Sequence, residues 1–330
     1  MSINSEKSSQ IKIMDANVSW RDWPKSLRES IRYRYLLHHL VKRDVKVRYR
    51  NSVLGVIWSL LNPLLMMLVF TLVFGRLMPN QDIRSYAIFV LVGLLPWQFF
   101  SGSMLSGTVS VTIGAPMIRK VYFPRELLPT SAVLSNLVNF LLAGIVLVVF
   151  LYAAGIGLTI HALWVPVLLA TQILFVLGLV LVTSSVNVFY RDVMMIVDVL
   201  LLAWFFLTPV VYPLEWLSTQ QTIMGYTFEP AVVMRWLNPM ASIIDGYRTV
   251  LWGTLGSDGP VAMDPIYLAR TFVTAAIIFV VGYLLFARYQ HIFAEKSQIP
   301  CLLHGNPNMI HSQWIFIADV DIALMRTDGP

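Results

Sequence analysis

Long apolar stretches separated by short polar connections dominate the pattern of this 330-residue chain. A helix needs about 20 mostly apolar residues to cross a bilayer, and six stretches approach or exceed this length. They cover residues 53–74, 86–112, 127–152, 164–188, 194–212 and 271–287. The pattern therefore predicts an all-α integral membrane protein with six transmembrane helices and with both termini on the same side.

The connection between the fifth and sixth stretches, residues 213–268, is too long for a turn and is interrupted by Pro, Gly and charge. Its apolar part, residues 237–252, is short and contains Asp245 and Arg248. Such a stretch is typical of re-entrant or interfacial helices that other parts of the protein shield from lipid. We expect re-entrant helices on the outer side; a solvated outer loop is the alternative.

The chain before the first apolar stretch predicts a different kind of helix. In residues 25–50, apolar side chains recur at helical spacing among Lys and Arg, as in an amphipathic helix that lies in the membrane surface. Residues 298–330 show no clear period. We therefore divide the chain into a cytoplasmic segment 1–52, a transmembrane domain 53–288 and a tail 289–330, and assign no role to residues 298–330.

Composition and charge support this division and orient it. Charged residues make up 13% of the chain, against about 25% in soluble domains. Nineteen of the 24 Lys and Arg residues fall on the side of the termini, four fall on the other side, and Arg270 lies at a boundary. Because positively charged loops stay in the cytoplasm, both termini are predicted to be cytoplasmic.

No cleavable signal peptide is expected. The chain has a single cysteine, Cys301, so no disulfide framework is predicted, and no Cys and His residues have the spacing of a metal site.

The chain lacks a sequence that would bind ATP. The phosphate-binding loop of ATPases ends in Gly-Lys, and none of the seven lysines follows a glycine. If transport is driven by ATP, the ATPase is another chain and must dock on a cytoplasmic loop. The loop 113–126 is the best candidate, because Pro116 suits the first turn of a short helix and Pro124 ends it.

This short helix has one apolar face with positive charge beside it. The three-to-four residue rule places four apolar side chains together, flanked by two cations; the predicted docking residues are Met117, Ile118, Arg119, Lys120, Val121 and Tyr122. Such a knob fits a groove on a partner. An ordinary cytoplasmic turn with positive-inside charge is the alternative.

Five blocks in order resemble the type-2 ABC permeases that export O-antigen or teichoic acid. They are VKRDVKVRYRNSVLGVIWSLLNP at 41–63, GLLPWQFF at 93–100, IRKVYFPRE at 118–126, NVFYRD at 187–192 and NPMASIIDGYR at 238–248. The resemblance covers residues 25–297. It implies a homodimeric permease in the bacterial plasma membrane, bound to two copies of an ABC ATPase that carries ATP and Mg. It also implies that residues 117–122 form the coupling helix, that the amphipathic helix is the interface helix, and that the cargo is a polysaccharide linked to undecaprenyl pyrophosphate.

Two sets of side chains suit such a cargo. A pyrophosphate group favours several cationic donors, and a basic cluster lies where a lipid headgroup would enter: Lys42, Arg43, Lys46, Arg48 and Arg50. Sugars stack on aromatic faces, and the predicted channel-lining set is Trp97, Phe99, Phe100, Trp204, Phe205, Phe206 and Tyr212. The plainer alternative for the basic cluster is that it only enforces topology. Three further aromatic residues, Trp216, Trp236 and Trp252, either line the same path or form an aromatic belt that faces lipid.

A membrane acyltransferase is one alternative to a permease. His39 and Asp44 have the His-x-x-x-x-Asp spacing of some acyltransferases, but residues five apart do not share a helix face.

Asp198 has two interpretations. An ionisable group inside a span is expected to be functional, whereas a residue this close to Asp192 can instead lie at the cytoplasmic interface. We expect no covalent chemistry on this chain. The alternatives are an ABC permease for a drug or lipid, and a non-transport membrane subunit of glycan synthesis.

Overall fold

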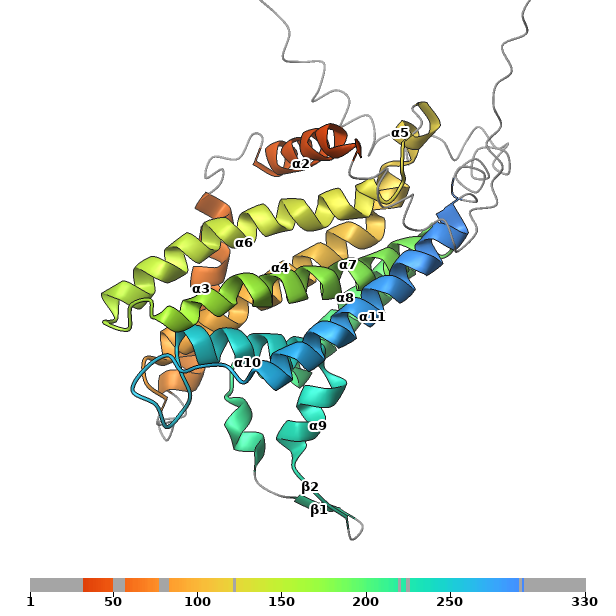
Figure 1. The fold of residues 1–330 in the computed structure, drawn as a ribbon. Helices are drawn as coiled ribbons and strands as arrows, with labels where there is room; N and C mark the ends of the chain where they lie inside the picture. The colour runs from red at the N-terminus through yellow and green to blue at the C-terminus, as the bar shows by residue number, and fades with distance from the viewer. Residues whose placement is uncertain are drawn as a thin grey trace, which may run out of the picture.

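The computed structural model describes residues 32–49, 57–76, 83–120, 123–218, 221–223, 226–290 and 293. The helices and strands, drawn in Figure 1, are α2 (Arg34–Tyr49), α3 (Ile57–Arg76), α4 (Tyr86–Ile113), α5 (Ala115–Lys120), α6 (Leu127–Ala153), η1 (Ile160–Trp164), α7 (Val165–Phe189), α8 (Val193–Leu207), η2 (Leu214–Ser218), β1 (Gln221–Ile223), β2 (Tyr226–Phe228), α9 (Pro230–Leu237), α10 (Pro239–Leu251) and α11 (Pro265–Tyr289).

Each of the six predicted apolar stretches contains a helix. By length and composition, four are suited to cross a membrane: Tyr86–Ile113, Leu127–Ala153, Ile160–Phe189 and Pro265–Tyr289. The other two, Leu60–Gly75 and Val193–Leu207, are shorter apolar helices. The fold is therefore that of a multi-pass helical membrane protein, and six complete crossings stay a prediction.

The last two apolar helices differ from their predicted limits for local reasons. The prediction extended the fifth stretch to residue 212, whereas α8 ends at Leu207. Thr208 precedes Pro209 and is extended, as a residue before proline prefers. Helix α11 begins six residues before the predicted stretch, because Pro265 occupies its first turn and the Asp264 carboxylate accepts a hydrogen bond from the Ile266 amide.

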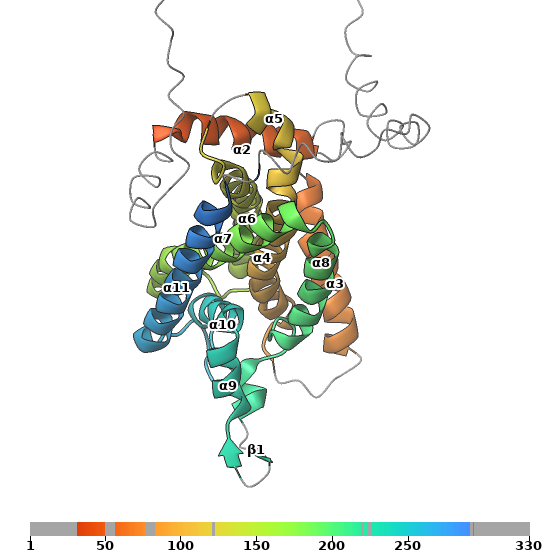
Figure 2. The same cartoon turned by 90° about the vertical axis from the view of Figure 1, so that its right-hand side faces the viewer.

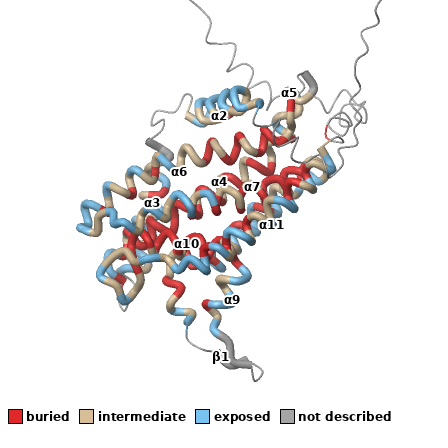
Figure 3. Tube along the Cα trace, in the orientation of Figure 1, coloured by how far each residue is buried: buried red, intermediate tan, exposed pale blue. Residues whose placement is uncertain are grey.

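Helix α4 lies at the centre of the bundle and is apolar on all sides. It contacts α3, α6, α7, α8 and α10, and Figure 3 shows most of its length buried. A helix that is hydrophobic all round belongs in an interior. Helix α7 packs against α4 and also closely against α11, because Gly178 and Gly282 face each other with no side chain between the backbones of α7 and α11.

The predicted outer segment folds into elements of two kinds. Strands β1 and β2 form an antiparallel hairpin in which Gln221 pairs with Phe228, an addition to the all-α prediction. Helix α10 is buried against α4, α7 and α11, so it is not part of a solvated loop. Figures 1 and 2 place α9 and the hairpin at one end of the molecule, with α2 and α5 at the opposite end.

Candidate functional site

The predicted docking helix forms, but its apolar face meets the chain itself. Gly114 ends α4, and α5 follows with Pro116 in its first turn. Met117 and Ile118 are half-buried against an apolar cluster that α2 and the start of α6 share, with Leu40, Leu127 and Leu128 among its buried members. These two side chains are therefore not free to form the knob that the sequence predicted. Val121, Tyr122 and the side chains of Arg119 and Lys120 lie outside the described residues.

Ile118 also touches a second cluster. It packs against a group of buried residues from the neighbouring ends of α4, α7 and α11, which includes Val111, Leu181 and Phe286. One side chain of α5 thus packs against two apolar clusters, one that α2 and α6 share and one that α4, α7 and α11 form. A displacement of α5 cannot leave these helices unaffected, because packed interiors have little free volume.

Helix α2, the predicted surface helix, runs beside the first half of α6 and in the same direction. The Ser131 hydroxyl donates to the Asp44 carboxylate (3.3 Å), the Arg48 guanidinium donates to Asn136 Oδ1 (2.9 Å), and the Tyr49 hydroxyl donates to Asn139 Oδ1. These contacts fix the register of the two helices.

The predicted basic cluster divides into residues with different surroundings. Arg43 pairs with Asp44 at 2.8 Å, and Lys42 and Lys46 are exposed. Arg48 alone of the described members reaches α6, and Arg50 lies outside the described residues. His39 lies against the His38 ring, while Asp44 is engaged by Arg43 and Ser131. The His39–Asp44 arrangement of an acyltransferase is therefore not formed.

A polar cleft of about 340 Å³ lies where α2 meets α3, α4 and α6. Its lining combines amide, hydroxyl and cationic side chains with aliphatic and aromatic ones: Arg48, Tyr49, Asn62, Leu95, Gln98, Phe99, Ser101, Gly102, Leu105, Asn136, Asn139, Phe140 and Ala143. The positions on α4 and α6 fall near the midpoints of those helices. Polar groups at such depth are costly and by default functional.

Asn136 supports one wall of this cleft. Its amide nitrogen donates to the Ala132 carbonyl and to Ser106 Oγ, both at 2.8 Å, while its oxygen accepts from Arg48. Gly102 leaves the room it needs, because a Cβ there would lie 3.1 Å from Asn136 Oδ1. Asn136 therefore holds the Arg48 guanidinium in place. These amides were not predicted from the sequence, although isolated Asn and Gln within apolar stretches are a visible signal.

The predicted channel aromatics are mostly packed together. Trp97, Phe99 and Phe100 are buried, and the rings of Phe100 and Trp204 meet at 5.1 Å between centroids. Because these rings fill the core, Trp97 and Phe100 do not line an open passage in this conformation, which corrects the prediction; one edge of Phe99 reaches the polar cleft. Phe205 stacks on Phe70 of α3.

The remaining aromatic and acidic candidates vary in exposure. Phe206 is 65% exposed, and the Tyr212 side chain is half-buried. Trp216 and Trp236 are exposed, as in a belt, but Trp252 is buried and donates to the Arg84 carbonyl at 2.9 Å, so the belt interpretation is wrong for it. Asp198 is exposed on α8.

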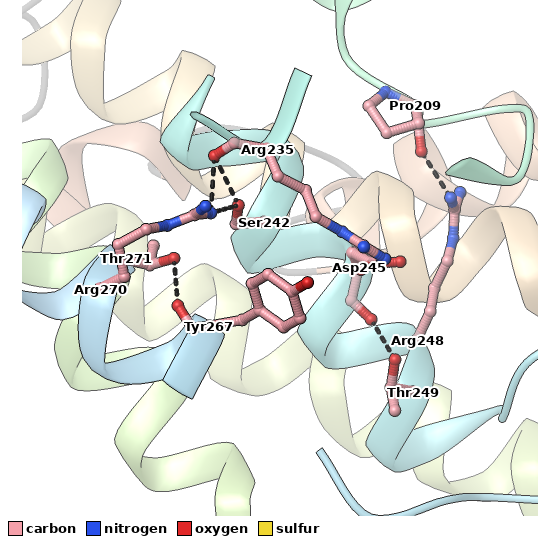
Figure 4. A network of polar contacts seen from close by, with 9 residues as sticks. All are labelled: Pro209, Arg235, Ser242, Asp245, Arg248, Thr249, Tyr267, Arg270 and Thr271. Atoms are coloured by element: carbon pink, nitrogen blue, oxygen red, sulfur yellow. Dashed lines mark hydrogen bonds and ion pairs between the residues drawn. The ribbon is translucent and has the colours of Figure 1, made fainter. Parts of the chain in front are cut away.

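A buried arginine holds the irregular segment after α8. Arg248 of α10 donates to the carbonyl oxygens of Pro209, Val210 and Tyr212, and its guanidinium lies 3.7 Å from the Phe89 ring centroid. Figure 4 shows it reaching toward Pro209. Burial lowers the pKa of Arg248 to about 10, so the side chain is still a cation at neutral pH. Non-helical backbone away from water needs such donors.

A second polar network joins α9, α10 and α11 (Figure 4). Arg235 forms an ion pair with Asp245 (3.0 Å), and Arg270 donates to the Arg235 carbonyl (2.8 Å). Asn238, between α9 and α10, caps α10 and donates to Thr208 at 2.8 Å, while Trp204 donates to it. Helices α9 and α10 are thus fastened to α8 and α11. Among the described residues, no group of three or more His, Cys, Asp or Glu could hold a metal ion.

Comparison with known proteins assigns the chain to a family. Residues 35–252 match the ABC-2 type transporter model. The chain is 39% identical over 226 residues to the O-antigen export system permease protein RfbA of Myxococcus xanthus, covering 68% of this chain and 84% of that protein. It is 31% identical over 263 residues to the RfbA permease protein of Klebsiella pneumoniae, covering 79% of this chain and 94% of that protein. The chain therefore belongs to the ABC-2 type transporter family, among the relatives of O-antigen export permeases.

Proposed function

We propose that this chain is the permease subunit of an ATP-driven exporter, which moves a polysaccharide linked to undecaprenyl pyrophosphate outward across the bacterial plasma membrane. The observation that carries the proposal is the similarity to O-antigen export permeases along most of the chain. The polar cleft beside α2 supports it, because its amide, hydroxyl and cationic side chains suit a cargo with a polar, phosphorylated headgroup.

In this proposal the end with α2 and α5 faces the cytoplasm, and a separate ATPase that binds ATP and Mg docks there. Motion of the ATPase reaches the permease through Ile118, which contacts both apolar clusters at this end. The exposed surface of α5, including Pro116, meets the ATPase. The inward-facing side chains pass the displacement to α2, α6 and α11.

The permease acts as a homodimer with two ATPase copies. Helices α3 and α8 expose large apolar side chains such as Leu68, Val69, Val199 and Leu202, which suit contact with a second copy or with lipid. A passage wide enough for a glycan does not fit inside one packed bundle, so it forms at the dimer axis. Phe206 and Tyr212 are the aromatic candidates for contact with the glycan.

The test is export in a bacterial strain that lacks its own O-antigen permease. The chain and its cognate ATPase are expressed together, and polysaccharide at the cell surface is measured. Wild type should restore surface polysaccharide, whereas Ile118→Ser should reduce it while the ATPase still co-purifies and hydrolyses ATP.

Ile160→Ser is the matched control, because Ile160 is 72% exposed at the opposite end of the molecule; its export should equal that of wild type. Failure of the wild-type pair to restore any surface polysaccharide would contradict the assigned cargo. Binding of ATP by the purified chain alone would contradict the division of labour between two chains.

A further inference from the structure

We infer that the polar cleft between α2, α3, α4 and α6 is a binding site for a sugar phosphate, the phosphorylated end of the lipid-linked glycan. The inference rests on the proposed function and gives its cargo a location. The cleft volume of about 340 Å³ lies at the small end of the range that small-molecule sites occupy. It suits one sugar unit with its phosphate and excludes a longer stretch of polymer.

The phosphate belongs at the α2 end of the cleft. Arg48 has one N–H committed to Asn136, and the others have no hydrogen-bond partner within the described ranges. A guanidinium held by one bond and free at the others is ready to bind phosphate oxygens through two parallel bonds. Tyr49 lies beside it with its hydroxyl fixed by Asn139.

The sugar belongs farther along α4 and α6. Gln98, Asn62 and the Asn139 amide nitrogen line the cleft, and the described part of the chain offers them no hydrogen-bond partner. Each primary amide carries donors and acceptors, which match the paired hydroxyl groups of a sugar ring. Phe140, whose ring is tilted against that of Phe99 at 5.5 Å between centroids, provides an apolar wall for the ring face.

A phospholipid fits this lining less well. The phosphate of a phospholipid would bind Arg48 equally, but its acyl chains leave the amides of Gln98, Asn62 and Asn139 unpaired. An unpaired polar group in an apolar environment is unfavourable, which disfavours the lipid at three positions. The hydroxyl groups of a sugar can pair with all three amides, so these amides favour a sugar phosphate over a phospholipid.

The direct test is binding to the full-length chain in nanodiscs made of zwitterionic lipid. Titration calorimetry is run with N-acetylglucosamine 1-phosphate, N-acetylglucosamine, inorganic phosphate and short-chain phosphatidylglycerol as separate probes. The sugar phosphate should bind more tightly than each of the other three. Arg48→Gln and Gln98→Leu should each weaken its binding roughly tenfold or more, and Ser101→Leu, which fills the cleft, should abolish binding.

Arg34→Gln is the matched control for Arg48→Gln, because both residues lie on α2 but Arg34 is exposed, lies against the Tyr35 ring and does not line the cleft. It should bind like wild type. Equal weakening by both substitutions would mean that surface charge alone attracts phosphate, and would overturn the inference. Binding of inorganic phosphate or phosphatidylglycerol as tight as that of the sugar phosphate would overturn it as well.

The export measurement separates this inference from the proposed function. If wild type restores surface polysaccharide but the cleft variants bind the sugar phosphate unchanged, the cleft assignment is wrong and the permease function stands. If wild type exports nothing, the proposed function is wrong, whatever the probes do.

Discussion

At the scale of single residues, Arg248 satisfies three carbonyl oxygens that no helix or strand partner serves. Its side chain passes Gly93 of α4, where a Cβ would lie 2.6 Å from Arg248 Nη2 and 3.0 Å from the Val210 carbonyl oxygen. The glycine is thus required for space, and the arginine for hydrogen bonding. Together they allow the chain to leave α8 without exposing unpaired backbone groups in an apolar environment.

Replacing Arg248 with Met should therefore be strongly destabilising. The substitution leaves the carbonyls of Pro209, Val210 and Tyr212 without their donor, and hydrogen bonds to a charged group contribute about 1.5–3 kcal/mol each. We expect a loss of at least about 3 kcal/mol, measured as thermal unfolding of the detergent-solubilised protein. Arg191→Met, at an exposed turn, should leave the unfolding temperature within about 1 °C of wild type. An equal loss for both variants would contradict the assigned role.

From the sequence, the chemical character of individual residues could be predicted better than the contacts that surround them. The sequence marked Arg48 as a phosphate-binding candidate and Arg248 as unusual within an apolar stretch, because charge in such a stretch is visible without a structure. It could not tell that Trp97 and Phe100 fill the core, since a ring in a span has the same sequence signal whether it faces a passage, lipid or other helices. That distinction depends on which helices are neighbours.

At the scale of elements, the contact between α7 and α11 depends on two glycines. A Cβ on Gly282 would collide with the Gly178 backbone, and one on Gly178 would lie 2.6 Å from the Phe279 nitrogen. Small residues at such a crossing let helix backbones approach closely, which is how helices associate in lipid. The pair fixes the distance between α7 and α11.

Gly282→Ala should force these helices apart. Because the obstructing atoms are backbone, local side-chain rearrangement cannot relieve the collision, and we expect a loss of about 1–3 kcal/mol in detergent unfolding. Gly144→Ala on α6 is the matched comparison, since nothing lies within 4 Å of its Cβ position. It should be neutral or stabilising by up to about 1 kcal/mol. A stable Gly282→Ala variant would show that α11 can shift without cost.

The apolar stretches predicted the helices well because length and hydrophobicity are local properties. Pro116 and Pro124 likewise predicted a short helix, which forms as α5, Ala115–Lys120. The β1–β2 hairpin was not predicted, and the helices that bury α10 could not be named from the local pattern. Those partners depend on contacts between segments far apart in the chain, such as Arg248 with residues 209–212.

At the scale of the whole molecule, the apolar interior is divided. One large cluster joins α4 with α6, α7, α10 and α11, whereas two smaller clusters lie at the end that carries α2 and α5. No buried residue of the α2 cluster belongs to the large one. The large cluster can therefore stay packed when the α2 cluster loosens, and a loosened α2 affects Arg48, which lines the polar cleft.

Leu40→Ala tests this independence. Leu40 is 3% exposed and is the buried residue of α2 in the cluster that it shares with the start of α6; truncating a buried Leu costs about 2–5 kcal/mol. Since that loss falls on the small cluster, we expect amide hydrogen exchange to accelerate throughout α2 and to stay unchanged in α4 and α7. Tyr35→Ala, at a position on α2 that is 71% exposed, should leave exchange in α2 unchanged. If Leu40→Ala accelerates exchange in α4 as much as in α2, the molecule opens as one unit, and α2 cannot carry motion from α5 to the cleft separately from the bundle.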